Sequence, residues 1–391
     1  MDSAEREGLC PKGNVPNLRF PEFQGEWEKC KLVDIITFST TRVNSSELNK
    51  DNYVSTENML QDYQGIVKAK SVPEDVNVVS FSCGDVLISN IRPYLKKVWK
   101  ATFNGGCSSD VFVLKANDNI ESDYLHYVIA NDKFINFVMS GAKGVKMPRG
   151  DKKQMETYSL SLPQIQEQHK IARLLSLLDE RISTQNKIIE DLKKLKSAII
   201  EIEYTPNTKT TSHIGDVIEQ ISKRNKNNAI KNVLSVSNRQ GFIKQSDQFE
   251  NRNIASEDTS NYKIVEQNNF AFNPARINVG SIARLTTFEK GIVSPMYICF
   301  RTQENVAPEY IDFFFESKHF YCEIQKRLEG SVRQCLSFEG LCNIPFSLPS
   351  LEIQQRIGKR LFTLGQMIKT ETDLLELLNK QKLYLLRQMF I

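Results

Sequence analysis

The sequence predicts an α+β protein with two mixed α/β domains, related by pseudo-twofold symmetry and separated by two long antiparallel helices that form a coiled coil. The string Leu-Pro-x-x-x-x-Gln-x-x-Ile begins at Leu162 and again at Leu348. Each copy opens a long stretch with helical apolar spacing. A chain of 391 residues also exceeds what one hydrophobic core usually serves. The repeated string and the chain length therefore predict a duplicated domain, with a long helix at the end of each copy.

The spacing of these features predicts five segments along the chain. They are an N-terminal arm (1–20), a first domain (21–161), a first spacer helix (162–204), a second domain (205–347) and a second spacer helix (348–391). Short alternating apolar runs between turn residues predict small sheets in the first domain, at 31–38, 76–81, 85–89 and 111–114. One helix is expected from about Ser122 to Ser140, followed by the Gly- and Lys-rich loop 141–153.

The second domain repeats the order of the first. Glu309-Tyr310-Ile311 corresponds to Asp123-Tyr124-Leu125 at the same offset as the two helix-opening strings, and Gly330 corresponds to Gly144. A polar stretch from Thr205 to Ser212 predicts a linker before this domain. The sequences between these anchors are unlike in the two halves. We therefore expect the two domains to share a scaffold and to differ in their loops.

The two spacer helices carry apolar residues at heptad spacing. In the first helix, steps of seven give two sets: Ile171, Leu178, Gln185, Leu192 and Ile199, and Leu174, Arg181, Ile188, Leu195 and Ile202. In the second helix, the stripe contains Ile357, Leu364, Glu371, Leu378 and Leu385, with Met367 and Leu374, widened by Leu361, Ile368 and Leu375. Such a stripe also suits a helix that only covers a core, but about 40 residues make a helix of about 60 Å, longer than a domain of this size needs. Gln185 and Glu371 occupy the same central position of the two copies, which predicts that they meet as a register-setting pair.

Composition excludes several classes of protein. The net charge is only +4, from 51 basic and 47 acidic residues, so a nucleic-acid surface requires local clustering. The eight cysteines are scattered without metal-ligand spacing and are expected to be reduced thiols. The N-terminus lacks the pattern of a secretory signal, and no apolar run is long enough for a bilayer, which indicates a cytoplasmic protein without membrane contact.

Motifs for catalysis are missing from the sequence. Amino methylation of a base needs a cofactor loop and an Asn/Asp-Pro-Pro-aromatic string, and Asn273-Pro274-Ala275-Arg276 lacks both the second proline and the aromatic residue. No phosphate-binding Gly-x-x-x-x-Gly-Lys-Ser/Thr loop occurs. Asp151-Lys152-Lys153 is more typical of a solvated charge run than of a nuclease site, and the four histidines stand apart from any nucleophile. The pattern favours a protein that binds, with no catalytic or metal-ligating residues of its own.

Basic and amide residues gather in corresponding loops of both halves, which predicts DNA binding. Arg, Asn and Tyr can contact base edges, whereas lysines neutralise phosphates. In the first half the candidates are Asn90, Arg92, Tyr94, Lys96, Lys97, Lys143, Lys146, Arg149 and Lys152. In the second half they are Arg224 with its neighbours Lys223 and Lys226, then Arg239, Asn273, Arg276, Arg327 and Arg333. Each cluster alone fits a solvated surface; their recurrence in a duplicated unit favours DNA, and the differing loops predict an asymmetric, gapped site.

The layout resembles the specificity (S) subunit of type I restriction-modification systems over nearly the whole chain. The residues that carry the resemblance are the two helix-opening strings at 162–171 and 348–357, supported by 16–23 and Trp27 at the start and by 330–338 before the second helix. The positions after the motif glutamines, His169 and Gln355-Arg356, depart from the charge that the family often has there.

The resemblance implies two target-recognition domains that each read half of a bipartite DNA sequence. It also implies that the helices set the gap and dock two methyltransferase (M) subunits, which carry S-adenosylmethionine and methylate adenine N6, and that restriction (R) subunits with ATP and Mg join the complex. The exposed faces of the helix starts, around Gln168, Arg173, Gln354 and Arg360, are the hypothetical M-subunit contacts, with simple solvent exposure as the alternative for any one of them. The sequence also fits two alternatives: a stand-alone DNA-binding regulator that dimerises through its coiled coil, and a scaffold that binds no nucleic acid.

Overall fold

The computed structural model describes residues 13–144, 146–205, 212–238, 240–248, 258–330 and 334–391. The chain forms two compact units, and the division falls inside the two long helices and not at their ends. The first unit contains residues 1–185 and 374–391, and the second contains 186–373. Each unit therefore holds one half of each long helix, α5 (Ile165–Tyr204) and α10 (Leu351–Gln388). The predicted linker at 205–212 and arm at 1–20 lie largely outside the described residues.

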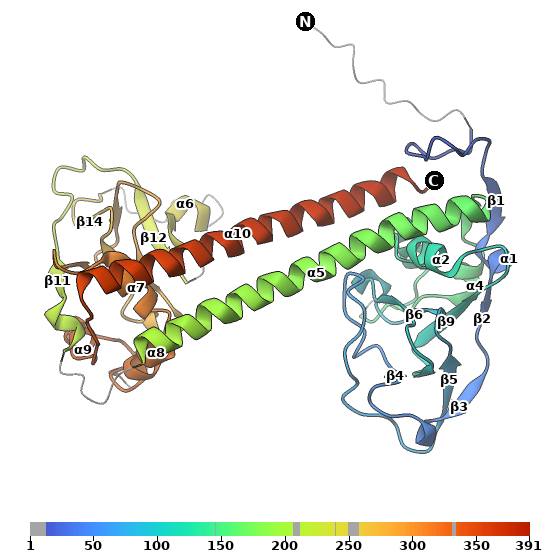
Figure 1. Cartoon of the computed structure of the whole chain (residues 1–391), viewed down its shortest axis with the longest axis horizontal. Coiled ribbons are helices and arrows are strands. Elements are labelled where there is room, and N and C mark those ends of the chain that lie inside the picture. Colours follow the sequence, from blue (N-terminus) through green and yellow to red (C-terminus); the bar gives the residue numbers. More distant parts are fainter. Residues whose placement is uncertain (1–12, 145, 206–211, 239, 249–257, 331–333) are drawn as a thin grey trace, which may run out of the picture. The chain divides into compact units, whose positions relative to one another are not determined.

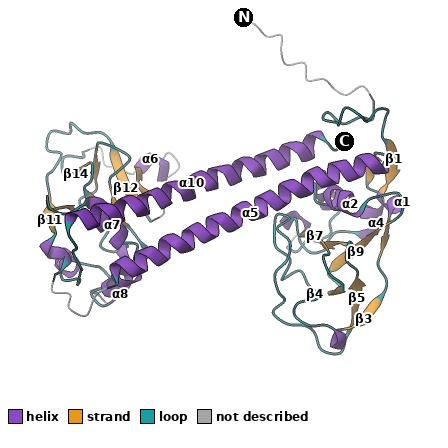
Figure 2. Ribbon diagram, in the orientation of Figure 1, coloured by secondary structure: helices purple, strands orange, loops and turns teal. Residues whose placement is uncertain are grey.

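The first unit is a mixed α/β body with two four-stranded sheets and a strand pair (Figures 1 and 2). One sheet has the order β2-β9-β6-β7 and the other β3-β5-β8-β4, while β1 pairs with β10. The strands are β1 Glu28–Lys31, β2 Ile36–Phe38, β3 Arg42–Asn44, β4 Tyr53–Val54, β5 Asn77–Phe81, β6 Val86–Ser89, β7 Val98–Lys100, β8 Gly105–Cys107, β9 Val111–Ala116 and β10 Ser159–Leu162. The short helices are α1 Leu32–Ile35, α2 Ser122–Ile129, α3 Asp132–Ser140 and α4 Lys152–Glu156, with 3-10 turns at Ser45–Glu47 and Pro93–Leu95.

The second unit repeats this architecture with its own variations. Its sheets have the orders β11-β18-β15-β16 and β13-β12-β17-β14. The strands are β11 Ile218–Ile221, β12 Val233–Ser237, β13 Gly241–Lys244, β14 Lys263–Glu266, β15 Phe270–Phe272, β16 Ile282–Arg284, β17 Lys290–Val293 and β18 Ile298–Thr302. The helices are α6 Gln245–Gln248, α7 Pro308–Phe314, α8 Lys318–Gln325 and α9 Phe338–Cys342, with 3-10 turns at Ile214–Asp216 and Ile277–Val279.

Strand pairing shows which parts of the repeat are equivalent. The antiparallel sheet β2-β9-β6-β7 matches β11-β18-β15-β16 strand for strand. In the other sheet, a parallel pair (β4 with β8, β12 with β17) lies beside an antiparallel one (β5 with β8, β14 with β17) in both units. The extra strand is added at opposite edges, β3 beside β5 and β13 beside β12. The predicted duplication of a mixed α/β scaffold is confirmed.

The prediction of one helix over 122–140 is wrong, because the chain forms α2 and α3 with a break at Ala130 and Asn131. The Asn131 side chain accepts a hydrogen bond from the Lys133 backbone N–H, and so caps a new helix. The apolar spacing continues across the break because Val128 and Phe134 both enter the same core. Periodicity alone therefore could not reveal this break.

Both long helices bury one stripe and expose another. On α5 the first predicted heptad set is right: Ile171, Leu178 and Gln185 are buried, while Leu192 and Ile199 are partly buried. Of the second set only Leu174 is partly buried, and the rest is wrong, because Ile188, Leu195 and Ile202 are exposed, with Ile202 at 76%. The positions that complete the buried stripe lie one residue further along, at Leu175, Ile182, Ile189 and Lys196.

On α10, Ile357, Leu361 and Leu378 are buried as expected, and Met367 is exposed. Within the first unit, Lys382 of α10 lies 2.6 Å from Asp179 of α5, and within the second, Arg360 lies 3.6 Å from Glu203. The start of each helix thus lies beside the end of the other, as antiparallel helices require. Gln185 is buried and Glu371 is partly buried; their meeting stays a prediction.

Candidate nucleic-acid interface

In the first unit, two loops that are far apart in sequence come together. The loop between β6 and β7 bonds to the loop between α3 and α4 through Arg92 N–H to the Pro148 carbonyl (2.7 Å) and Gly150 N–H to the Asn90 carbonyl (3.0 Å). We call the exposed side chains of these two loops, together with Lys152 at the start of α4, the first basic surface: Arg92, Tyr94, Lys143, Lys146, Arg149 and Lys152. Six of the nine residues predicted in this half are thus exposed in or beside two loops that the fold joins.

Local contacts hold the charged side chains of the first basic surface. Arg149 lies 3.3 Å from Asp110 and Lys143 lies 2.8 Å from Asp151, and both basic side chains remain more than half exposed. The hydrogen bond from Lys143 and backbone N–H groups lower the pKa of Asp151, which also caps α4. The Lys152 ammonium lies 4.6 Å from the centre of the Phe38 ring. The cations therefore have local contacts but remain available to an external anion.

The other three predicted residues of this half lie at the base of the loop. Lys96 lies 2.8 Å from Asp132, and Lys97 donates a hydrogen bond to the Thr56 carbonyl. Burial, followed by the nearby Arg92 charge, lowers the pKa of Lys97. The Asn90 Oδ1 atom is buried with no hydrogen-bond partner among the described residues. Their geometry assigns Lys96 and Lys97 to the support of the loop, and a DNA contact for these three stays an untested prediction.

The second unit builds an equivalent junction with different residues. The loop between β15 and β16 meets the segment before α9, because the Leu336 N–H donates to the Pro274 carbonyl (3.1 Å). The backbone of Glu329 pairs with that of Cys335, as Lys143 pairs with Arg149 in the first unit. Arg276 is exposed at this junction. Two further predicted arginines, Arg239 and Arg333, lie outside the described residues.

Two predicted residues of the second half have internal structural roles. Asn273 is buried, and its side chain accepts a hydrogen bond from the Ala275 backbone N–H. The Arg327 guanidinium bonds to Glu323 and, at 3.0 Å, to the Asn343 carbonyl. These contacts shape the loop and anchor the end of α8. Their geometry gives the predicted DNA contacts of both residues no support.

Arg224 lies in a separate basic hollow of the second unit. This hollow has a volume of about 750 Å³ and is lined in part by Lys223, Arg224, Lys226 and Lys290. The Arg224 guanidinium donates to Asn261 (3.0 Å), and Lys290 lies 2.8 Å from Glu266. The sequence pointed to the run 223–226 but not to Lys290, which lies much later in the chain and joins the hollow only through folding.

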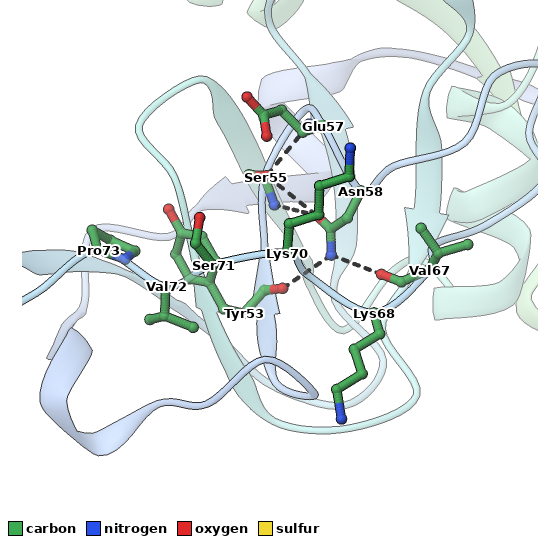
Figure 3. Close-up of a pocket in the computed structure, with 10 residues that line it drawn as sticks. All are labelled: Tyr53, Ser55, Glu57, Asn58, Val67, Lys68, Lys70, Ser71, Val72 and Pro73. Carbon is green, nitrogen blue, oxygen red and sulfur yellow. Dashed lines mark hydrogen bonds between the residues drawn. The ribbon is translucent and has the colours of Figure 1, made fainter.

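A smaller polar pocket of about 300 Å³ lies beside β4 in the first unit (Figure 3). The Asn58 amide fixes its wall by donating to the carbonyls of Tyr53 (3.1 Å) and Val67 (2.9 Å). Lys68 and Lys70 line it, and Lys68 lies 2.8 Å from Asp51. The sequence alone did not point to these two lysines. Only one residue separates them, and they are not part of an extended run of basic residues.

The expectation that the helix-opening glutamines lie on an exposed face is wrong. Gln168 and Gln354 are each 1% exposed. The Gln168 amide accepts from the Glu121 N–H (2.8 Å) and donates to the carbonyls of Asn119 and Pro163. Gln354 makes the equivalent bonds in the second repeat: its amide accepts a hydrogen bond from the Ala307 N–H (2.9 Å) and donates one to the Pro349 carbonyl. Each glutamine ties the start of a long helix to the start of α2 or α7, and its burial leaves almost no side-chain surface for a partner protein.

The two arginines predicted beside these glutamines are exposed. Arg173 lies 3.9 Å from Glu180, and Arg360 lies 3.6 Å from Glu203. Exposed ion pairs at such separations contribute little to stability. The role of both arginines as partner contacts stays a prediction.

The described residues offer neither a metal site nor a membrane span. Among them, no group of three or more His, Cys, Asp or Glu side chains is placed to hold a metal ion. Within the same part of the chain, no helix has the length and apolar character needed to cross a membrane.

Comparison with known proteins decides the family. The model of the type I restriction modification DNA specificity domain matches twice, over residues 24–194 and 206–380. The chain belongs to this family. The two matches contain the two copies of the internal repeat, and each runs from a mixed α/β body into a long helix.

Relatives and solved structures agree with the family assignment. The MjaVIII specificity subunit of Methanocaldococcus jannaschii is 25% identical over 314 residues, 71% of this chain and 72% of the relative. The putative MjaX specificity subunit of the same organism is 25% identical over 412 residues, covering 94% of this chain and 92% of the relative. The structure of a type I restriction-modification S subunit from M. genitalium superposes with a TM-score of 0.61 over 96% of this chain and 99% of that chain, at 15% identity. The predicted family and fold class are thereby confirmed.

Proposed function

We propose that this specificity-family chain reads an asymmetric, bipartite double-stranded DNA target with one unit per half-site. It acts without catalysing a reaction itself and docks two methyltransferase (M) subunits and, through the complex, restriction (R) subunits. In this proposal S-adenosylmethionine belongs to the M subunit, and ATP and Mg to the R subunit. The observation that carries the proposal is the pair of basic loop junctions, at Arg92 and at Arg276, in equivalent places of a repeated scaffold.

The difference between the two junctions supports an asymmetric target. The first basic surface has several exposed cations and Tyr94, whereas the described part of the second junction offers Arg276 and is accompanied in the same unit by the hollow at Lys223 and Lys290. Side chains that differ in kind and position present different donors to base edges. Two unlike reading surfaces on one chain should therefore select two unlike half-sites.

Methylation sequencing of cells that carry this chain and its partner subunits tests the proposal. We expect N6-methyladenine within a single gapped, asymmetric motif. Gel-shift assays with and without the M subunit separate the alternatives. The proposal predicts sequence-specific binding mainly with the M subunit present, whereas a stand-alone regulator would bind alone and a scaffold would not bind DNA. Loss of the motif should follow deletion of the gene for this chain.

Arg92→Ala and Arg276→Ala test the division of labour between the units. Each is expected to cost about 1–3 kcal/mol of binding to the preferred sequence and to relax the sequence preference at one half-site only, because a base-reading arginine carries local specificity. Binding of the purified complex to a library of randomised duplexes measures this. Lys146→Ala, which removes an exposed lysine of the first basic surface, is the control for a phosphate contact and should weaken all sequences and flatten the salt dependence. Equal relaxation of both half-sites by either arginine variant would refute the assignment.

Lengthening both long helices by one heptad tests their role as a spacer. Seven residues inserted after Gln185 and seven after Glu371 add about 10 Å of helix while keeping the seam in phase. We expect the gap of the recognised motif to grow by about 3 base pairs, because B-DNA rises about 3.4 Å per pair. Insertion of seven residues in α5 alone is the control and should impair folding or activity. An unchanged gap in an active double-insertion variant would rule out the spacer role.

A further inference from the structure

The base of the β6–β7 loop is clamped by a three-residue cluster. The Asp132 carboxylate, at the first position of α3, lies 2.8 Å from the Lys96 ammonium and accepts a hydrogen bond from the Tyr63 hydroxyl (3.3 Å). The Lys96 ammonium also lies 5.9 Å from the centre of the Tyr63 ring. Burial and the Asp132 charge raise the pKa of Tyr63, which therefore remains a donor. The cluster joins three segments that are far apart in sequence.

The backbone at this cluster adopts a conformation that side chains usually disfavour. Asp62, Tyr63, Arg92 and Lys96 all have positive φ, between 51° and 62°, although none of them is glycine. The two turns bond to each other through Asp62 N–H to the Leu95 carbonyl (3.1 Å) and Tyr63 N–H to the Lys96 carbonyl (3.0 Å). A non-glycine residue in this region costs free energy and persists only where surrounding contacts enforce it. Beside these backbone bonds, the Asp132 side chain contacts two of the four residues, Lys96 and Tyr63.

We propose that Asp132 is a positioning residue for DNA reading, which fixes the β6–β7 loop in the conformation that presents Arg92 and Tyr94 to the first half-site. This inference rests on the proposed function. Arg92 begins the 3-10 turn Pro93–Leu95 and Lys96 ends it, so the clamp on Lys96 sets the direction of the exposed side chains in between. Asp132 acts through the loop and need not touch DNA itself.

The described residues of the second unit show no matching clamp, so this unit supplies an internal control. Lys318 starts α8 where Asp132 starts α3, and a lysine cannot accept the bonds that Asp132 accepts. The residue before the corresponding 3-10 turn, Arg276, has a φ of −135° and needs no enforcement. Loss of Asp132 should therefore affect one half-site and leave the other as it was.

The test measures sequence selection by the full-length chain in complex with its M subunits. Complexes with Asp132→Asn, Asp132→Glu and Tyr63→Phe are incubated with randomised DNA duplexes, and the bound fraction is sequenced. We expect Asp132→Asn to reduce sequence discrimination by about five- to tenfold at one half-site, the same one that Arg92→Ala relaxes. Tyr63→Phe should reduce it there by less. The other half-site should change by less than about twofold. Asp132→Glu, which keeps the charge, should restore most of the discrimination.

Matched controls separate positioning from a general loss of structure. Glu376→Gln breaks another exposed pair of the same unit, with Lys380 at 2.6 Å on α10, and should leave selection unchanged. Melting temperatures of all variants are measured alongside. An Asp132→Asn complex that selects the first half-site as well as the wild type overturns the inference, as does an equal loss at both half-sites. A wild-type complex that selects no bipartite motif overturns the proposed function instead.

Discussion

Phe390→Ala is expected to lower the free energy of unfolding of the first unit by about 3–5 kcal/mol, although the residue lies next to the end of the chain. Phe390 is buried, and its ring stacks on Tyr124 with centroids 5.2 Å apart. Its neighbours Leu386 and Met389 enter the same core. Removing the ring leaves a cavity against a tyrosine that is itself fully buried. Hydrogen exchange by mass spectrometry, followed separately for β6 and β15, measures the effect in each unit.

The repeat provides the matched variant for this test. Tyr204, which stands in the first repeat where Phe390 stands in the second, packs on Tyr310 at 4.8 Å and donates a hydrogen bond to its carbonyl (2.7 Å) within the second unit. Tyr204→Ala should accelerate exchange at β15, and Phe390→Ala at β6. Ile391→Ala, at a residue that is 39% exposed, should change neither by more than about 0.5 kcal/mol. Equal acceleration in both units by Phe390→Ala would contradict the assignment.

These contacts show that each repeat completes the core of the other. The end of α5, which belongs to the first sequence repeat, is part of the second unit, and the end of α10 is part of the first. Each long helix also contributes a cation–π contact to the unit of the other repeat. Lys196 of α5 lies over the Phe313 ring (5.1 Å), and its equivalent in the second repeat, Lys382 of α10, lies over the Tyr127 ring (5.9 Å). Neither sequence repeat therefore buries its full core with its own residues alone.

The sequence could predict the repeat and the long helices because both depend on local periodicity. One buried set on each helix, with Ile171 and Ile357 as first members, follows directly from that period. Residue type predicts the second set on α5 one residue too early, because Ile188 and Leu195 are apolar but exposed, while the partly buried Lys196 takes a seam position. Apolar residue type alone does not show which of two adjacent rows of residues on a helix is buried.

The candidate surface could be predicted only in part. Arg92 and Arg149 were named from their residue types, and folding brings their loops together. Lys96 and Arg327 look the same in sequence, yet each has an acidic partner, Asp132 or Glu323. Asp132 lies well beyond Lys96 in the chain, and only the packing of α3 against the loop brings the two together. Arg149 also has an acidic partner, Asp110, and yet remains exposed. The sequence alone therefore does not distinguish a cation that supports the fold from one that stays available at the surface.

Gln168→Ala is expected to destabilise the first unit by about 3 kcal/mol or more, because it leaves three backbone groups without their partner and an unsatisfied buried polar group costs about 1–3 kcal/mol. The Glu121 N–H and the carbonyls of Asn119 and Pro163 all bond to this one amide. Glu121 also caps α2 through its own side chain, so the loss reaches the start of that helix. Denaturant unfolding and hydrogen exchange at α2 measure the effect.

Two related variants make the result specific. Gln354→Ala removes two bonds at the equivalent place and should destabilise the second unit, by about 2 kcal/mol. Gln166→Ala, two positions from Gln168 but exposed, should stay within about 0.5 kcal/mol of the wild type. If Gln168→Ala unfolds like the wild type but loses its M subunit, the glutamine is a docking residue after all. If stability falls and the M subunit still binds the folded fraction, the glutamine of the family motif holds the fold together.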